Sequence, residues 1–133
     1  MTAGNVDIVR RAYEAFREGD VEQLMSMASE DFVLRASSAV DGVEHHGPQA
    51  MREVIDVIRG RWEDFRLEPL EFYDAGNQVL VLGTLITKGH GDEGFASTAG
   101  QVWTLKDGQI VFMEAFLDTE EAIRASGLTR LLT

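Results

Sequence analysis

Apolar residues in the first third of the chain recur every three or four positions, the period of a helix that buries one face. They are Val6, Val9, Tyr13 and Phe16. Gly19 is the expected end of this helix, because glycine tolerates the left-handed backbone of a helix terminus. Asp20 and, three residues later, Gln23 form a capping-box pattern that predicts a second, short helix. A loose alternation over Asp31–Ala36 then predicts a first strand.

A third helix is predicted from Gly47-Pro48, because a proline at the first helical position gives up only a donor that has no partner there. Apolar residues at helical spacing carry this helix to about Trp62, where the period changes from helical to alternating. Four strands are then predicted, over Arg66–Asp74, Gln78–Lys88, Phe95–Lys106 and Gln109–Leu117. Asp118, with Glu121 three residues on, predicts a last short helix that ends at Gly127.

This order of elements predicts an α+β fold, with a curved antiparallel sheet packed against helices in one domain over residues 1–133. A chain of this length buries roughly two thirds of its unfolded surface, which is enough for a core without staples. The chain has no cysteine. Disulfides, thiolate metal ligands and cysteine nucleophiles are therefore excluded.

Charge narrows the choice of partners. Twelve basic residues stand against 23 acidic ones, for a net charge of −11, so nucleic acids and anionic membranes are poor partners. The longest nearly unbroken apolar run, Val79–Ile86, is too short to cross a bilayer. The N-terminal residues show no basic segment followed by an apolar one, so we expect no secretion signal and a cytoplasmic protein.

The last predicted hairpin allows two registers. A two-residue turn at Asp107-Gly108 would place Gln101 opposite Glu114, on the same face as Trp103. A three-residue loop would shift the pairing by one position and turn Glu114 to the outside. We favour the three-residue loop because it spares a carboxylate from burial.

Four stretches stand out for their order and spacing. They are Tyr13–Asp20, His46–Glu53, Val102–Ile110 and Phe116–Ala122. Together they resemble the SnoaL-like branch of the nuclear transport factor 2-like superfamily, which also contains the ketosteroid isomerases, and the resemblance runs from about Val6 to Leu128. It implies a cystatin-like α+β cone, in which three helices from the first half of the chain wrap the sheet around an apolar pocket. It also implies homodimers that pack sheet against sheet.

The resemblance also shows which catalytic groups are missing. The position of the isomerase general base falls at Ala36, and the protonated aspartate of the oxyanion hole falls at Gln101. The isomerase tyrosine falls at Ala12, with Tyr13 one residue along. Because alanine cannot take a proton, we expect no steroid-isomerase activity of useful rate. The late-strand aspartate of the related limonene epoxide hydrolases falls near Ala115, so their mechanism is not expected either.

Three residues are the catalytic candidates. Gln101 can donate and accept hydrogen bonds and so orient a ligand carbonyl or hydroxyl, or it can be a buried amide satisfied by backbone or water. Tyr13 lies on the apolar stripe and is either core packing or a pocket acid. His46 is a candidate for acid–base work because histidine is the residue type that ordinarily changes charge near neutral pH, or it is an exposed residue before the third helix. We expect the ligand to contact Leu34, Ala36, Val81, Leu85, Trp103, Met113, Ala115 and Leu117.

We expect neither a metal site nor a cofactor. His45 and His46 are adjacent, so on an extended segment they point to opposite faces, and His90 lies far away in a glycine-rich loop. Arg35 alternates with two apolar neighbours and is predicted to point outward into a salt bridge.

Three functions remain open. The first is an isomerase- or cyclase-type enzyme acting on a small hydrophobic molecule with a carbonyl group. The second is a protein that binds such a molecule without catalysis. The third is a dimerisation module whose pocket is filled by its own side chains, in particular by methionines.

The long strands are apolar on both faces, which predicts self-association. One set of residues can line the cone, and the other would lie on the convex face. The convex set is Leu80, Leu82, Ile86, Val102, Phe112 and Phe116. An antiparallel sheet with one wet face should alternate between apolar and polar, so we expect a twofold homodimer through this face.

Overall fold

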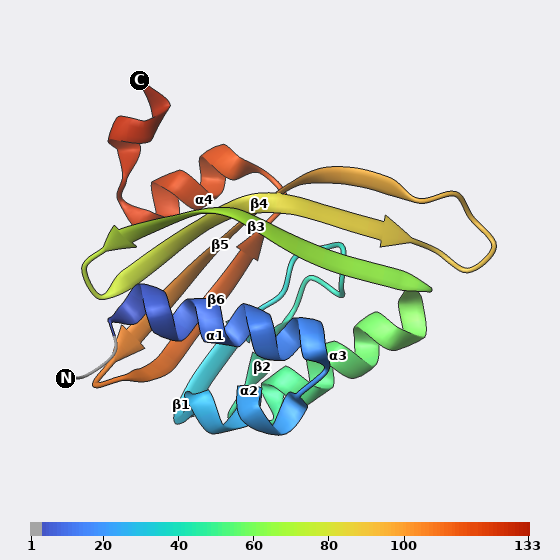
Figure 1. Cartoon of the computed structure of the whole chain (residues 1–133), viewed down its shortest axis with the longest axis horizontal. Coiled ribbons are helices and arrows are strands. Elements are labelled where there is room, and N and C mark those ends of the chain that lie inside the picture. The colour runs from blue at the N-terminus through green and yellow to red at the C-terminus, as the bar shows by residue number, and fades with distance from the viewer. Residues whose placement is uncertain (1–3) are drawn as a thin grey trace.

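Three helices lie on the concave side of a curved sheet in the computed structural model, which describes residues 4–133 (Figure 1). Residues 1–3, part of the stretch considered above for a secretion signal, lie outside the described residues. The helices are α1 (Asn5–Glu18), α2 (Val21–Met27) and α3 (Ala50–Arg61). The strands are β1 (Ala28–Arg35), β2 (Glu44–His46), β3 (Asp64–Ala75), β4 (Gln78–Lys88), β5 (Phe95–Lys106) and β6 (Gln109–Phe116). The chain closes with α4 (Thr119–Ser126) and a short 3₁₀ helix (Thr129–Leu132).

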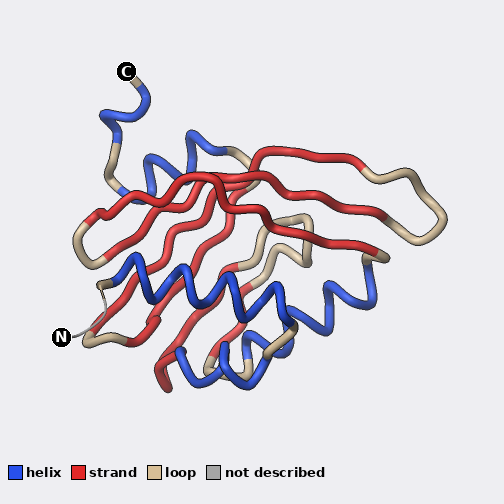
Figure 2. Tube along the Cα trace, in the orientation of Figure 1, coloured by secondary structure: helices blue, strands red, loops and turns tan. Residues whose placement is uncertain are grey.

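The expected α+β class is confirmed, but the sheet is mixed rather than purely antiparallel. Its order is β2-β1-β6-β5-β4-β3, and β1 pairs with β6 in parallel while all other neighbours are antiparallel. The short strand β2 was not predicted, because three residues are too few to show an alternation. Figure 2 shows the loop after β4 projecting beyond the rest of the sheet.

The local signals in the sequence place most boundaries within two or three residues. Asp20 caps α2 by accepting a hydrogen bond from the backbone N–H of Gln23 at 3.1 Å. Gly19 and Gly127 adopt left-handed backbones at the ends of α1 and α4. Pro48 is not the first helical residue as predicted, since it lies in the turn before α3, which begins at Ala50. Among the described residues no helix has the length and apolar character needed to cross a membrane.

The β5–β6 hairpin corrects one prediction. The turn has two residues, Asp107 and Gly108, both with positive φ, and Lys106 pairs with Gln109. The three-residue loop was therefore wrong. A β-bulge at Val111 then shifts the register by one residue, so that Gln101 pairs with Ala115. The half-buried side chain of Glu114 therefore faces outward, as predicted, and contacts Arg35. The expected pairing of Gln101 with Ala115 is therefore present, but it is set by the bulge and not by the turn.

The convex face also differs from its prediction. Leu80 and Val102 were assigned to an exposed patch, but α4 and the segment after it cover them, and both are buried. Ala122, Ile123 and Leu128 complete this second apolar cluster. Helix α4 can approach closely because a Cβ on Gly100 would stand only 2.5 Å from the Cβ of Ala122. The convex face is therefore bare only on its other half.

Candidate functional site

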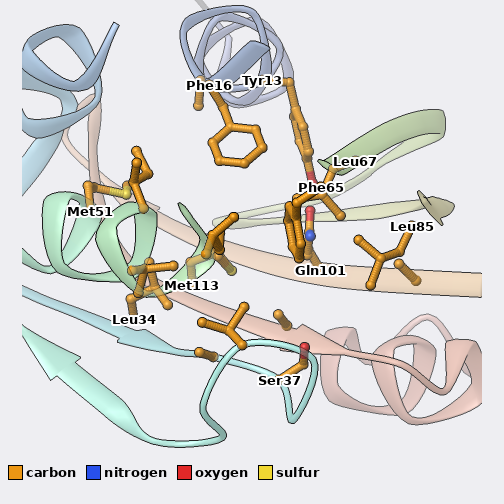
Figure 3. Close-up of a pocket in the computed structure, with 18 of the residues that line it drawn as sticks. Tyr13, Phe16, Leu34, Ser37, Met51, Phe65, Leu67, Leu85, Gln101 and Met113 are labelled. Carbon is orange, nitrogen blue, oxygen red and sulfur yellow. The ribbon is translucent and has the colours of Figure 1, made fainter. Parts of the chain in front are cut away.

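A cavity lies between the concave face of the sheet and the helices α1 and α3 (Figure 3). Its volume is about 80 Å³, counted over the positions open to the centre of a water-sized sphere. One water needs roughly 10–15 Å³ on that count, so the cavity has room for several waters or for a small organic molecule. Its lining consists of Ala12, Tyr13, Phe16, Leu24, Leu34, Ala36, Ser37, Val40, Met51, Val54, Ile55, Ile58, Phe65, Leu67, Leu85, Ala99, Gln101, Trp103, Met113, Ala115, Phe116 and Leu117.

Gln101 is the polar group on the sheet side of this cavity. It lies in β5, where its partner across the ladder is Ala115, and the residue is only 6% exposed. Within residues 4–133 no hydrogen bond is made by its side-chain amide. Its amide atoms are not fully enclosed by protein, so its two N–H groups and its carbonyl oxygen are open to the cavity and available to a bound molecule. In Figure 3 the amide lies beside Phe65, among the apolar lining.

Tyr13 supplies a second polar group from the opposite wall. The indole N–H of Trp103 donates to the Tyr13 hydroxyl oxygen at 3.2 Å, which leaves the hydroxyl proton free to be donated onward. The ring of Tyr13 also packs edge-on against Phe72 and Trp103, at centroid distances of 5.8 and 5.5 Å. Burial raises the pKa of Tyr13, and the Trp103 hydrogen bond opposes that rise only in part. Tyr13 is therefore a neutral donor near pH 7.

Most of the residues expected to contact a ligand line the cavity, but one does not. Leu34, Ala36, Leu85, Trp103, Met113, Ala115 and Leu117 are part of the lining, with Leu117 at its solvent-exposed edge. Val81 instead lines a smaller neighbouring pocket, which also touches Tyr13 and Gln101. Alternation assigns a face of the strand but not a position along it, so it could not separate the cavity from this neighbouring pocket.

His46 is not part of the cavity. Its side chain is 67% exposed and lies 3.4 Å from a Glu44 oxygen, outside the lining. The neighbouring His45 contacts two carboxylates: its Nε2 is 2.8 Å from Asp41, and its Nδ1 is 3.2 Å from Glu53. Burial lowers the pKa of His45, but the hydrogen bonds and charges of the two carboxylates outweigh it, so the pKa lies above its ordinary value.

His45 ties two parts of the cavity wall together. Asp41 belongs to the loop after β1, which contributes Ser37 and Val40 to the lining, and Glu53 belongs to α3. The sequence offered no signal for this cluster because β2 itself was not predicted. Among residues 4–133 no group of three potential ligands is arranged to hold a metal ion.

Arg35 points outward, as predicted. Its guanidinium contacts Glu44 at 2.6 Å and Glu114 at 3.0 Å, and these contacts raise the pKa of Arg35. Glu114 thus has the basic partner that its place on the outer face required. The sequence reasoning missed several lining residues, among them Ser37, Phe16 and Phe65. The helical spacing of Phe16 marked it as buried, but it could not indicate an unfilled space beside the ring.

The chemistry available in the cavity is hydrogen bonding without proton transfer to a carboxylate or imidazole. The described lining contains no aspartate, glutamate or histidine. A neutral hydroxyl donor and an amide can orient a carbonyl and stabilise charge that develops on its oxygen. The lining includes Ala36, the residue that the resemblance set at the position of the isomerase base.

Comparison with known proteins identifies the family. The SnoaL-like domain matches residues 9–113. A nuclear transport factor 2-like protein of unknown function from Burkholderia pseudomallei is 27% identical, with a TM-score of 0.79 over 92% of this chain and 97% of that one. A putative polyketide cyclase from Sinorhizobium meliloti is 25% identical, with a TM-score of 0.69 over 83% of this chain and 94% of that one.

A further likeness concerns the fold alone. TerC, co-crystallised with polyporic acid, is 23% identical with a TM-score of 0.78 over 92% of this chain and 98% of that one. No curated protein matches the chain. The match to the domain extends over most of the described residues, and the topology agrees with it. The chain belongs to the SnoaL-like family of the nuclear transport factor 2-like superfamily.

Proposed function

We propose that this protein binds a small, mostly apolar molecule whose carbonyl or hydroxyl group is held by Gln101 and Tyr13. The observation that carries the proposal is Gln101, which lines the cavity, is only 6% exposed and makes no side-chain hydrogen bond among residues 4–133. A polar group in an apolar cavity is costly unless a ligand or water satisfies it. The surrounding aliphatic and aromatic side chains suit the apolar remainder of such a molecule.

The proposed reaction class is an isomerase- or cyclase-type rearrangement of a carbonyl compound. Its support is the family and the putative polyketide cyclase that is 25% identical. Hydrogen bonds from Gln101 and Tyr13 would stabilise an enolate-like oxygen, while the proton would leave to solvent or to a group on the substrate. Binding without catalysis is the second candidate, and the absence of acids and histidines from the described lining favours it.

The proposal includes a homodimer through the bare half of the convex face. Ile86 and Phe112 lie there half-buried in the single chain, whereas Leu82 and Phe116 pack against the cluster under α4. Phe112 is flanked by Arg35, whose guanidinium carbon is 5.5 Å from the ring centroid. A twofold axis through this face would cover the same residues on both copies.

Binding of two matched probes tests the role of Gln101. Butyrophenone carries a ketone, and butylbenzene has a similar shape without it. We expect Gln101→Leu to weaken butyrophenone binding about tenfold, because an amide–ketone hydrogen bond is lost. Butylbenzene should bind the variant at least as well as the parent, and stability in urea should not fall. Affinity is measured by calorimetry or by Trp103 fluorescence.

Gln109→Leu is the matched control, since Gln109 is exposed at the start of β6 and lies outside the cavity. It should leave both affinities unchanged. Equal responses of the two probes to Gln101→Leu would contradict the assigned role.

A further inference from the structure

A groove adjoins the cavity at the end opposite Ser37. It is formed where α1 and α3 end and β3 begins, and its volume is about 490 Å³ on the same count as the cavity. Five residues line both spaces: Phe16, Ile55, Ile58, Phe65 and Leu67. The two spaces are therefore separated by a single layer of side chains.

Two aromatic rings form the centre of that layer. Phe16 and Phe65 pack edge to face, with centroids 6.3 Å apart and planes at 81°. Figure 3 shows Phe16 and Ser37 at opposite ends of the cavity. Both phenylalanine rings line the cavity and the groove, so they form part of the wall between the two spaces.

The acidic and basic side chains of the groove differ in how they are paired. Its three carboxylates are each engaged by a cation. Glu63 lies 3.5 Å from Lys88, and Arg66 contacts Asp64 at 3.2 Å and Glu68 at 3.9 Å. The groove's other two arginines, Arg17 and Arg59, have no ion-pair or hydrogen-bond partner among residues 4–133.

These two arginines come from different helices but belong to one site. Arg17 is in the last turn of α1 and Arg59 in the last turn of α3. The Arg59 guanidinium reaches the end of α1, since its Nη2 is 4.0 Å from where a Cβ on Gly19 would stand. A last-turn position lets each arginine stabilise its own helix, but this does not require the two to line one groove.

We propose that this groove is an anion subsite, where Arg17 and Arg59 bind a carboxylate at the far end of the molecule whose apolar body occupies the cavity. Guanidinium groups form paired, charge-assisted hydrogen bonds with carboxylates, and two of them here have donors to spare. The chain has a net charge of −11, but the groove lining holds as many arginines as carboxylates, so an anion meets less repulsion there than over most of the surface. The inference rests on the proposed function and narrows its ligand to an aryl or alkyl keto acid.

Matched ketones and keto acids test the subsite. The acids are 3-benzoylpropionate, 4-benzoylbutyrate and 5-benzoylpentanoate, and each is compared with the phenyl ketone in which a methyl group replaces the carboxylate. We expect at least one acid to bind about tenfold more tightly than its ketone at low salt. This preference should shrink as ionic strength rises.

The variants assign that preference to the groove. Arg17→Gln and Arg59→Gln should each reduce it, and the double variant should abolish it while the neutral ketones bind as before. Arg11→Gln is the control, since Arg11 is exposed on the same helix as Arg17 but outside the groove and changes the net charge equally. It should keep the full preference.

Each other outcome has a definite meaning. Ketones and acids that bind equally, or an acid preference that survives in the double variant, would overturn the subsite while leaving the Gln101 proposal standing. Failure of every ketone and acid to bind would overturn both. Circular dichroism of the variants verifies that they remain folded.

Discussion

The two faces of the sheet have similar apolar residues but opposite packing. On the convex face, α4 lies so close that Gly100 and Ala122 touch, and Leu80 is completely buried. On the concave face, α1 presents large rings toward the sheet and a cavity remains. Small residues at a contact let two layers close, whereas bulky ones hold them apart. The functional space therefore follows from the size of the side chains that support it.

The largest expected effect tests the closed face. Leu80→Ala should lower the free energy of unfolding by about 2–5 kcal/mol, because it creates a void in a filled cluster. The comparison is Leu85→Ala on the same strand, where the side chain already borders the cavity and loses fewer contacts. We expect a clearly smaller loss for Leu85→Ala, measured by urea unfolding of both variants. Equal losses would mean that the two faces are packed alike.

The bare half of the convex face gives the next effect. Phe112→Glu would place like charges across a twofold axis, so we expect the dimer to dissociate about a hundredfold more readily. Sedimentation at micromolar concentration should give twice the chain mass of 14.7 kDa for the parent and the single mass for the variant. Lys106→Glu, exposed beside the β5–β6 turn, is the charge control and should remain dimeric. A monomeric parent would remove the proposed interface altogether.

The smallest expected effect concerns His45, which links Asp41 in the loop after β1 to Glu53 in α3. The raised pKa of His45 means that its stabilising contribution is complete below about pH 6.5 and is lost as pH rises through the higher folded-state pKa. We expect His45→Asn to destabilise the protein more at about pH 6.5 than at about pH 9, as measured by urea unfolding.

His46→Asn, at the exposed neighbouring position outside the Asp41–Glu53 bridge, is the control for the substitution itself. A His45→Asn deficit that grows toward high pH would contradict the bridging role. NMR titration of the two histidines in the parent protein gives an independent reading of the same sign.

Local signals in the sequence explain how much of the fold could be predicted. The Asp20 cap, the Asp107-Gly108 turn and the alternation of β4 and β5 act over a few residues, so they mark their elements directly. The parallel pairing of β1 with β6 joins segments about 80 residues apart and has no local signature. For the same reason the cover over Leu80 was missed, since nothing near Leu80 indicates where α4 will lie.

The sequence could predict which residues share one face of the sheet, but not that an open cavity lies beside them. Alternation placed Gln101 and Trp103 on one face, but Met113 was added to them through the three-residue loop, which was wrong. The bulge produces the same face, and the cavity lies against all three residues. The Arg17–Arg59 groove depends on where two helices end in space, and its charges look like ordinary helix termini in the sequence. His46 was preferred over His45 because only the structure reveals which imidazole meets the carboxylates.

The bulge at Val111 decides on which face of the sheet the Glu114 carboxylate lies. In a hairpin without it, Glu114 would stand opposite Gln101 and bring a carboxylate into an otherwise neutral cavity. At the present chain length, the bulge is thus what keeps the Glu114 carboxylate out of the cavity lining. A variant that lacks Val111 could pair without a bulge and still place Gln101 opposite Ala115, so a deletion at this point would leave Glu114 on the outer face.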